Sequence, residues 1–258
     1  MLQGKEVLAF REHEVLIRRR PYKRTIGITL QINGRIQVSA PRRTTYTEIQ
    51  NFLARHSVWI ENNLAKYKAI REKYPRKKYC EGEKFIFLGE NKSLRFVPGH
   101  GASARAVVDG DELLIAIPRS MWSGFDPQAP HEELASVVRS YYADAGKEFL
   151  SARLRHYSER MGLVPSSTCF RSQKTRWGSC SSSGRISLNW RLIVAPPDVI
   201  DYVIVHELSH LVHYNHSKAF WALVATQIPD YEAKRDWLRE NQYEADFLAT
   251  RSELHSSY

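Results

Sequence analysis

The sequence predicts an α+β protein: a β-rich N-terminal part with an inserted helix, followed by a half in which helices pack on a small antiparallel sheet. Short runs of alternating apolar and polar residues fill much of 14–40 and 84–117, which is typical of strands. From residue 131 onward, apolar residues recur mainly at three- and four-residue spacing, which is typical of helices. With 258 residues, 43% of them hydrophobic, the chain can bury one large or two small cores. A boundary near residues 124–130 divides it into residues 1–127 and 128–258.

The first elements form a hairpin followed by a helix. Residues 14–19 and 25–32 read as strands, and Asn33-Gly34 predicts a tight turn into a further strand at 35–40. Thr45 with Glu48 three residues later predicts a capping box that opens a helix, with a break near His56. The apolar side of this helical region comprises Ile49, Phe52, Leu53, Trp59, Ile60 and Leu64.

An exposed basic connector and a second group of strands come next. Residues 71–79 are too rich in charge to pack in a core. Four short strands are then predicted, and the last two flank the turn Asp109-Gly110-Asp111: 84–88, 93–97, 105–108 and 112–117.

The C-terminal half begins with a long helix. Its apolar pattern extends over residues 131–161, and Gly162 ends it. Strands are predicted at 169–172, 175–180 and 185–192, the last with one face packed and the other polar. A buried helix starts at Pro196-Pro197-Asp198, and further helices follow at 218–227 and from Asp230. The tail after Phe247 is expected to be loose.

One stretch carries an arrangement typical of metal chemistry. Residues 203–216 read V-I-V-H-E-L-S-H-L-V-H-Y-N-H, which contains H-E-x-x-H at His206, Glu207 and His210. Helix positions four apart lie one turn above each other, so His206 and His210 can point at one ion. Glu207 can reach a water on that ion without displacing either ligand, as the general base of a metalloprotease must. The apolar neighbours predict a buried helix, in which histidines without partners would be costly unless they held a metal.

A catalytic zinc site needs a third protein ligand and an open position for water. His216 is the first candidate, because Asn215 tolerates a left-handed backbone and can end the helix and turn the chain back. Ser217 then caps the next helix. His213 is the alternative ligand, since it also falls near the face of His206 and His210; we interpret it as a supporting or surface residue.

These motifs resemble the YgjP-like metallopeptidases, zincins related to the SprT-like proteases. The resemblance also extends to the N-terminal strands and to Trp59-Ile60, and its specific motifs are R-W-G-S-C at 176–180, I-S-L-N-W-R-L at 186–192, D-Y-V-I-V-H-E-L at 201–208, and N-H-S at 215–217 with Phe220-Trp221. It implies a zincin-like metallopeptidase domain at 128–258 after a basic β-rich domain at 1–127. It also implies Zn²⁺ held by His206, His210 and His216, with Glu207 as the base.

Composition restricts where such an enzyme works. No apolar run approaches the length needed to cross a bilayer, and the first twenty residues carry three glutamates and no continuous apolar segment, unlike a signal peptide. The three cysteines, Cys80, Cys169 and Cys180, cannot all pair and show no C-x-x-C spacing. We therefore expect no membrane association, and reduced thiols in a cytoplasm.

The net charge of +10 is unevenly distributed. Residues 1–80 hold 18 Lys and Arg against 6 acidic residues, and residues 81–258 hold 20 against 22. A basic N-terminal lobe suggests an anionic partner, and non-specific nucleic acid is the first candidate. The alternative is a solvated surface that keeps the protein soluble, because no base-reading motif accompanies the charge.

Peptide hydrolysis is the leading functional interpretation, with a protein or peptide as substrate. Zinc would polarise the scissile carbonyl, Glu207 would accept the proton of the water, and a sheet edge could bind an extended peptide. Tyr231, His213 and Arg176 are candidates to stabilise the oxyanion. The alternative is a nucleic-acid-associated protein whose basic lobe recognises the partner and whose metal site is subordinate or acts on nucleic-acid-bound proteins. A structural zinc module is disfavoured, because such a site needs no base beside its ligands.

Overall fold

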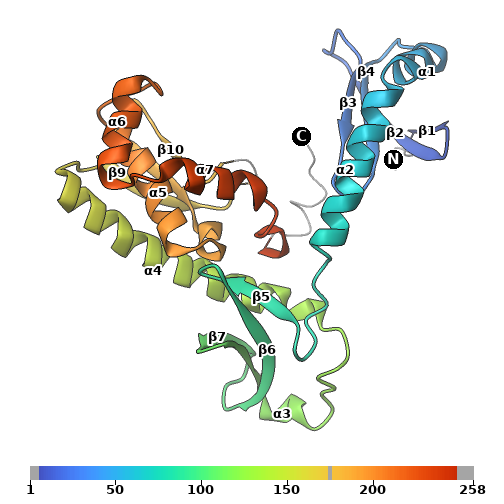
Figure 1. The fold of residues 1–258 in the computed structure, drawn as a ribbon. Helices are drawn as coiled ribbons and strands as arrows, with labels where there is room; N and C mark the ends of the chain where they lie inside the picture. The colour runs from blue at the N-terminus through green and yellow to red at the C-terminus, as the bar shows by residue number, and fades with distance from the viewer. Residues whose placement is uncertain (1–5, 174–175, 249–258) are drawn as a thin grey trace. The chain divides into compact units, whose positions relative to one another are not determined.

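The computed structural model describes residues 6–173 and 176–248 (Figure 1). The chain divides between Arg76 and Lys77 into two compact units, which we call the N-terminal unit and the C-terminal unit. We had expected the boundary after residue 127. The difference arises because the strands at residues 84–118 share a hydrophobic core with the long helix that follows them, through Phe85, Leu94, Val138 and Tyr142.

The N-terminal unit is a four-stranded sheet with two helices. Its strands are β1 (Glu6–Phe10), β2 (His13–Arg20), β3 (Gly27–Leu30) and β4 (Ile36–Pro41), in the order β1-β2-β4-β3, with β2 and β4 parallel. The predicted hairpin is confirmed: β3 and β4 pair antiparallel around Gly34, which has a positive φ of 84°. The helices α1 (Tyr46–Arg55) and α2 (Ser57–Lys73) meet at His56, and the capping box of Thr45 and Glu48 is present.

One face of this sheet packs against the helices. The fully buried residues are Val15, Ile17, Ile36, Val38 and Ala40 from the strands and Ile49, Leu53 and Ile60 from the helices. Trp59 differs from the expected pattern, because 47% of it is exposed whereas its neighbour Ile60 is fully buried. A helix can turn only one stripe of side chains towards a sheet, and Ile60 occupies that stripe.

The C-terminal unit begins with a second four-stranded sheet. Its strands run in the order β5-β6-β8-β7: β5 (Lys84–Phe87), β6 (Glu90–Gly99), β7 (Arg105–Asp109) and β8 (Glu112–Pro118). A short helix α3 (Arg119–Trp122) follows, then one 3₁₀ turn η1 (Glu132–Leu134) and the long helix α4 (Ala135–Met161). Gly162 ends α4 in the left-handed conformation, as predicted.

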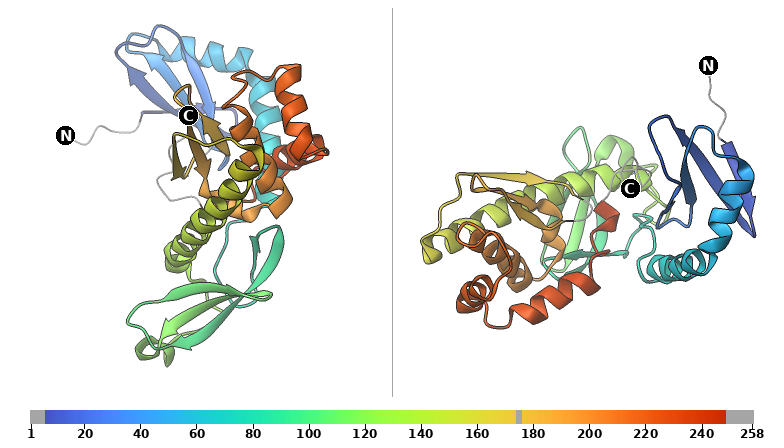
Figure 2. Two further views of the ribbon diagram at one scale, coloured as in Figure 1. Left: turned by 90° about the vertical axis from the view of Figure 1, so that its left-hand side faces the viewer. Right: turned by 90° about the horizontal axis from the view of Figure 1, so that it is seen from above.

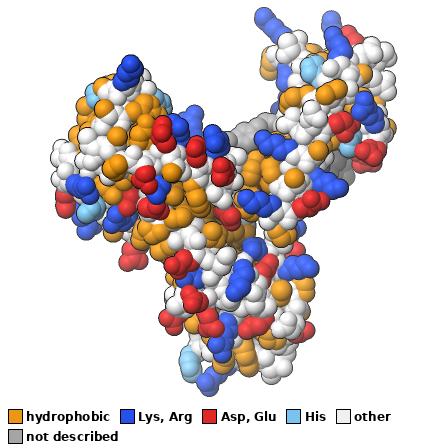
Figure 3. All heavy atoms as spheres, viewed as in Figure 1, with side chains coloured by type: hydrophobic (Ala, Val, Ile, Leu, Met, Phe, Trp, Pro, Cys, Tyr) orange, Lys and Arg blue, Asp and Glu red, His pale blue; other side chains and the backbone are white. Residues whose placement is uncertain are grey.

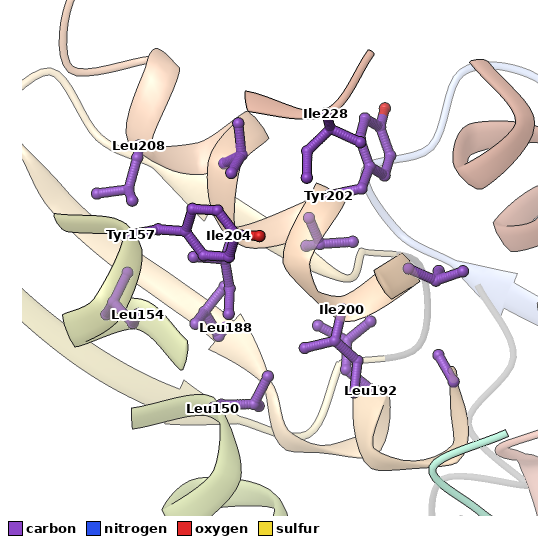
Figure 4. Packing of buried hydrophobic residues seen from close by; sticks show 14 of the residues in the cluster. Leu150, Leu154, Tyr157, Leu188, Leu192, Ile200, Tyr202, Ile204, Leu208 and Ile228 are labelled. Atoms are coloured by element: carbon purple, nitrogen blue, oxygen red, sulfur yellow. The ribbon is translucent and has the colours of Figure 1, made fainter. Parts of the chain in front are cut away.

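Helix α4 joins the two cores of this unit (Figure 2). Its first half packs with the β5–β8 sheet, and its second half contributes Leu150, Leu154 and Tyr157 to a second core. Figure 4 shows that second core, with α4 facing strand β11 and helix α5. Among the described residues, no helix combines the length and apolar character that crossing a bilayer requires.

The small sheet of the C-terminal unit is mixed. Strand β11 (Arg185–Asn189) pairs antiparallel with β10 (Gly178–Cys180) but parallel with β9 (Ser167–Arg171), where we had expected antiparallel pairing throughout. Residues 190–194 form the 3₁₀ helix η2 (Trp190–Val194) instead of extending the strand. Both faces of β11 are covered, so the side chains from Ile186 to Asn189 are all buried, including the Ser187 and Asn189 that we had placed on a polar face.

Three helices complete the unit. They are α5 (Pro197–Ser209), α6 (Lys218–Gln227) and α7 (Tyr231–Glu240), followed by one 3₁₀ turn η3 (Asp246–Leu248). The starts of α6 and α7 are as predicted, with Ser217 accepting a hydrogen bond from the Phe220 amide. The three cysteines are unpaired. The tail was predicted to be loose after Phe247, but Leu248 is buried in η3; the rest of the tail lies outside the described residues.

Candidate metal centre

Helix α5 carries the first two histidines. Most of this helix is buried, namely its residues 199–205 and 207–209. The helix ends at Ser209, where we had expected it to continue to Asn215. The Ser209 hydroxyl donates a hydrogen bond to the Val205 carbonyl oxygen at 2.7 Å, and backbone turns carry the chain away from residue 211 onward. His210 keeps a helical backbone as the capping residue, so its ring still lies one turn above that of His206, with centroids 4.9 Å apart.

The third histidine reaches the first two from the loop before α6. The Nε2 atoms of His216 and His206 lie 3.2 Å apart, and the His210–His216 ring centroids are 4.9 Å apart. One ligand atom from each of His206, His210 and His216 lies within 4.8 Å of the other two. The short α5 therefore still allows these histidines to converge, because Ser217 caps α6 directly after His216 and turns the chain back.

Phe220 forms the floor of the cluster. Its ring is fully buried, and its centroid lies 4.6 to 4.9 Å from those of His206, His210 and His216. An aromatic floor restricts the ring orientations of the three histidines and excludes water from below. The predicted apolar side of α6 thus supports the site directly.

His213 takes part through its backbone. The Nδ1 atom of His210 lies 3.0 Å from the His213 carbonyl oxygen, which can only accept a hydrogen bond. Nδ1 of His210 must therefore carry the proton, and Nε2 keeps the lone pair that a metal requires. The His213 side chain is outside the cluster of converging nitrogens.

The surroundings favour neutral imidazoles. Burial, together with His210 and His216, lowers the pKa of His206 to about 3, and burial and His210 also lower the pKa of His216. The Nδ1 atom of His206 is buried and has no hydrogen-bond partner among the described residues. A neutral imidazole with its Nε2 lone pair turned to the centre is the form that binds metals.

Glu207 lies beside this cluster on the sheet side of α5. Only 6% of the residue is exposed, and burial raises the pKa of its carboxyl group to about 8. A cation held by the histidines would oppose this shift by favouring the carboxylate. Burial thus makes Glu207 a stronger proton acceptor than an exposed glutamate.

Gly178 on strand β10 is the neighbour of Glu207. A Cβ atom at position 178 would lie 2.5 Å from Oε1 and 2.7 Å from Cγ of Glu207. These distances are too short for any side chain, so only glycine allows the strand to come this close. Strand β10 is an edge strand of the small sheet, and the sheet edge therefore runs past the carboxyl group of Glu207.

A stack of aromatic rings borders the histidine cluster. The Trp221 ring stacks on His216, with centroids 5.5 Å apart, and on Tyr231, with centroids 4.9 Å apart. The guanidinium carbon of Arg235 lies 5.6 Å from the centroid of Trp221. The structure thus brings Tyr231 to the wall of the site, whereas Arg176 is exposed on the segment before β10.

Sequence reasoning missed Gly178 and Arg235. Gly178 lies in the quoted R-W-G-S-C motif, and a glycine within a strand is a recognisable sign of close backbone approach. Arg235 had no comparable signal, because it is one of several charged residues along α7.

A comparison with known protein families finds a match over most of the chain. The model of the YgjP-like, metallopeptidase domain family matches residues 24–241. No curated protein matches the chain. Among solved structures, the metallopeptidase zymogen of Pyrococcus abyssi abylysin matches at 25% identity over 36% of this chain and 91% of that chain, with a TM-score of 0.32. The family match covers more than half of the chain, and this protein therefore belongs to the YgjP-like family of metal-dependent peptidases.

Proposed function

We propose that this protein is a zinc peptidase in which His206, His210 and His216 bind the metal and Glu207 is the general base. One observation carries the proposal: three imidazole nitrogens converge within 4.8 Å, and the residue that follows the first of these histidines in the chain is a buried glutamate. A zinc site with a purely structural role would not need a buried carboxyl group next to its ligands. The family match supports the peptidase class, and the identity of the metal rests on the donor set.

Three neutral imidazoles fit zinc well. Nitrogen donors suit zinc and other late transition metals, whereas magnesium and calcium prefer oxygen donors. Three protein ligands also leave the fourth tetrahedral position free for water or substrate. The hydrogen bond from His210 to the His213 carbonyl would set the tautomer of one ligand.

The metal and Glu207 would have different roles in peptide hydrolysis. Zinc, when bound, supplies a Lewis acid that polarises the scissile carbonyl and acidifies water. Glu207 would accept the proton of the attacking water and pass it to the leaving amine. Its burial keeps bulk water from competing for that proton, and the contact with Gly178 holds its carboxyl group in place.

Strand β10 offers a place for the substrate backbone. It pairs with β11 on one side only, so its other edge presents unpaired backbone groups among the described residues. An extended peptide could add to that edge as a further strand, with the Glu207 carboxyl group beside it. We therefore expect unfolded or extended protein segments to be cleaved before folded ones.

Glu207→Gln tests the role of the base. The amide keeps the size of the side chain but cannot accept a proton, so cleavage of a denatured protein should fall by a factor on the order of a hundred or more. Zinc content, measured on the same samples by atomic absorption, should not change. Glu159→Gln, which alters an exposed carboxylate at the end of α4, is the matched control and should keep full activity. Cleavage that survives Glu207→Gln would assign the base to another residue.

Paired histidine variants test the ligand set. His216→Ala should lower the zinc content well below one equivalent, because two imidazoles remain. His213→Ala should leave it near one equivalent, since His213 contributes only its backbone carbonyl oxygen. The reverse result would make His213 the third ligand. Stoichiometric zinc without cleavage of any unfolded protein would contradict the peptidase proposal for this chain.

A further inference from the structure

The division into two units places the excess positive charge in one of them. Residues 1–76 hold 16 Lys and Arg against 6 Glu and no Asp, and residues 77–258 hold 22 basic against 22 acidic residues. The whole net charge of +10 therefore belongs to the N-terminal unit. Such an imbalance gives that unit a positive field, which attracts polyanions.

The topology of the N-terminal sheet brings many of these cations to one end. Strands β2 and β4 are parallel, and their last residues, Arg20 and Pro41, are paired. Both strands therefore terminate at the same end of the sheet. Strand β3 starts at that end of the sheet, because its first residue, Gly27, pairs with Ser39. The strand ends and the adjoining loops carry six cations, which we call the basic end: Arg18, Arg20, Lys23, Arg24, Arg42 and Arg43.

Successive side chains of β2 point to opposite faces of the sheet, so Arg19 lies on a different face from Arg18 and Arg20. Arg19 points to the helix side, where its guanidinium pairs with Glu6 at 2.7 Å and donates to the Thr44 carbonyl oxygen. Arg18 and Arg20 point to the opposite, helix-free face, about 7 Å apart. Both are exposed, and neither has an ion-pair partner among the described residues.

A third cation, Lys23, lies near the same helix-free face. The Lys23 Nζ atom lies 2.5 Å from the hydroxyl oxygen of Ser39, and no carboxylate within the described ranges pairs with it. Glu14 is the acidic residue of β2 on that face, and it lies four residues from Arg18, or about 13 Å along the strand. Figure 3 shows Lys and Arg side chains (blue) protruding from the end of the N-terminal unit at which Figure 1 labels β4 and α1.

An exposed aromatic ring stands among these cations. Tyr22 is 96% exposed, the highest value among the large apolar side chains that the structure exposes, and it follows Arg20 and precedes Lys23 and Arg24. Tyr46, the first residue of α1, is half exposed at the same end, next to Arg19. An aromatic side chain gains nothing from full exposure to water in the free protein. Its place between cations is typical of surfaces on which bases stack while phosphates are neutralised.

We propose that the basic end of the N-terminal unit binds single-stranded nucleic acid without sequence preference. The six cations would contact phosphates, and the Tyr22 ring would stack on an unpaired base. The proposal is independent of the peptidase chemistry, since none of its residues lies in the C-terminal unit.

The features of this end favour single strands over other polyanions. A duplex keeps its bases stacked on one another, so the Tyr22 ring could not contact a base face. Insertion into an anionic membrane needs an apolar face beside the cations. Tyr22, however, lies in a loop whose immediate neighbours are charged residues and one proline.

Binding is measured by fluorescence anisotropy on the full-length protein. The probes are labelled oligo(dT) and oligo(U) of about 16 nucleotides, a duplex of the same length, and vesicles of phosphatidylserine and phosphatidylcholine. We expect one or both single strands to bind more tightly than the duplex, with an affinity that falls steeply between about 50 and 200 mM salt. A preference between the two single strands would identify DNA or RNA as the partner.

Two pairs of variants locate the site. Tyr22→Ala should weaken single-strand binding by about 5- to 150-fold, the usual effect of removing one base stack, whereas Tyr22→Phe should bind like the parent protein. Arg18→Gln with Arg20→Gln should reduce the slope of log K against log salt by about 1.4. The control with the same loss of charge is Arg35→Gln with Lys68→Gln, at the opposite end of the sheet. Arg35 adjoins the β3–β4 turn, and Lys68 lies one turn of α2 before Arg71, which contacts the Ile32 carbonyl oxygen at 2.6 Å.

Several outcomes would overturn the proposal. Absence of binding to both single strands at about 50 mM salt would leave the charge as a solubility feature. Equal losses in the Arg18/Arg20 and Arg35/Lys68 variants would mean that net charge and not this surface matters. Unchanged binding by Tyr22→Ala would contradict stacking of a base on the Tyr22 ring. Tighter binding to the duplex or to vesicles than to single strands would contradict the preference for single-stranded nucleic acid.

Discussion

The two units of this protein use their charged residues in opposite ways. The N-terminal unit places nearly all its cations at the surface around a single core of eight buried residues. The C-terminal unit balances its charges and buries several polar groups, among them Asn189, Arg191, Asp201 and Glu207. A charge at the surface costs little and can attract a partner over a distance. A buried one must be paired or given a function. The comparison suggests that one unit recognises a partner and the other performs chemistry.

The ion pairs of the two units illustrate this difference. Arg19 and Glu6 form a partly exposed pair at the end of the N-terminal sheet. In the C-terminal unit, Asp201 of α5 accepts hydrogen bonds from Arg153 of α4 at 2.6 and 2.5 Å and from the Tyr157 hydroxyl at 3.2 Å. This buried network fixes the helix that carries His206 and Glu207 against α4. Four predictions test the comparison, in order of decreasing effect.

Removal of the metal should affect the C-terminal unit alone. A ligand that binds only the folded state stabilises it by about 4 kcal/mol when its free concentration is a thousand times its Kd. Chelation should therefore abolish cleavage and lower the melting temperature of the C-terminal unit, as observed by calorimetry. The calorimetric transition of the N-terminal unit, and oligonucleotide binding, should stay unchanged. An equal shift in both units would contradict their independence.

Gly178→Ala should inactivate the enzyme without removing the metal. The new Cβ atom would lie 2.5 Å from Glu207 Oε1, so the carboxyl group must move. A displacement of about 1 Å at a reacting group costs on the order of a hundredfold in rate. Cleavage rate and zinc content are measured together. The control Gly124→Ala adds the same atom in open space, and similar losses in both variants would show that the contact with Glu207 is unimportant.

Asp201→Asn should destabilise the C-terminal unit by roughly 3 kcal/mol, at the lower end of the range for buried pairs, because Arg153 is about one-third exposed. Urea unfolding of the full-length protein measures this loss. Asp198→Asn is the matched control on the same helix. Asp198 is mostly exposed where it pairs with Lys234, so its loss should cost less than about 1 kcal/mol. Comparable costs would mean that the buried network does not anchor α5.

Glu6→Gln should have the smallest effect and should depend on pH. The hydrogen bond with Arg19 lowers the pKa of Glu6, so the folded state holds fewer protons than the unfolded state as the pH falls below about 5. The pair therefore stabilises the N-terminal unit above the ordinary pKa of glutamate and loses this contribution in acid. At pH 7 the variant should be less stable by under about 1 kcal/mol, and the difference should disappear as the pH falls through the lowered pKa of Glu6. A difference that persists in acid would assign the effect to packing.

The sequence by itself determined the local elements and the spacing of the first two candidate metal ligands. The capping box at Thr45, the Asn33-Gly34 turn and the end of α4 at Gly162 depend on residues within a few positions of one another, and all are confirmed. The spacing of His206 and His210 likewise brings both to one side of α5, because one helical turn separates them.

Only the tertiary structure decided which distant segments meet. The division of the chain after Arg76 follows from the core that α4 shares with the β5–β8 sheet, and no local pattern records that contact. Parallel pairing of β9 with β11 and the burial of both faces of β11 depend on elements far along the chain. The approach of Gly178 to Glu207 and the placement of Arg235 beside Trp221 have the same origin. Short-range patterns describe the preferences of each segment, but packing between segments selects their partners, because burial is determined by the whole fold.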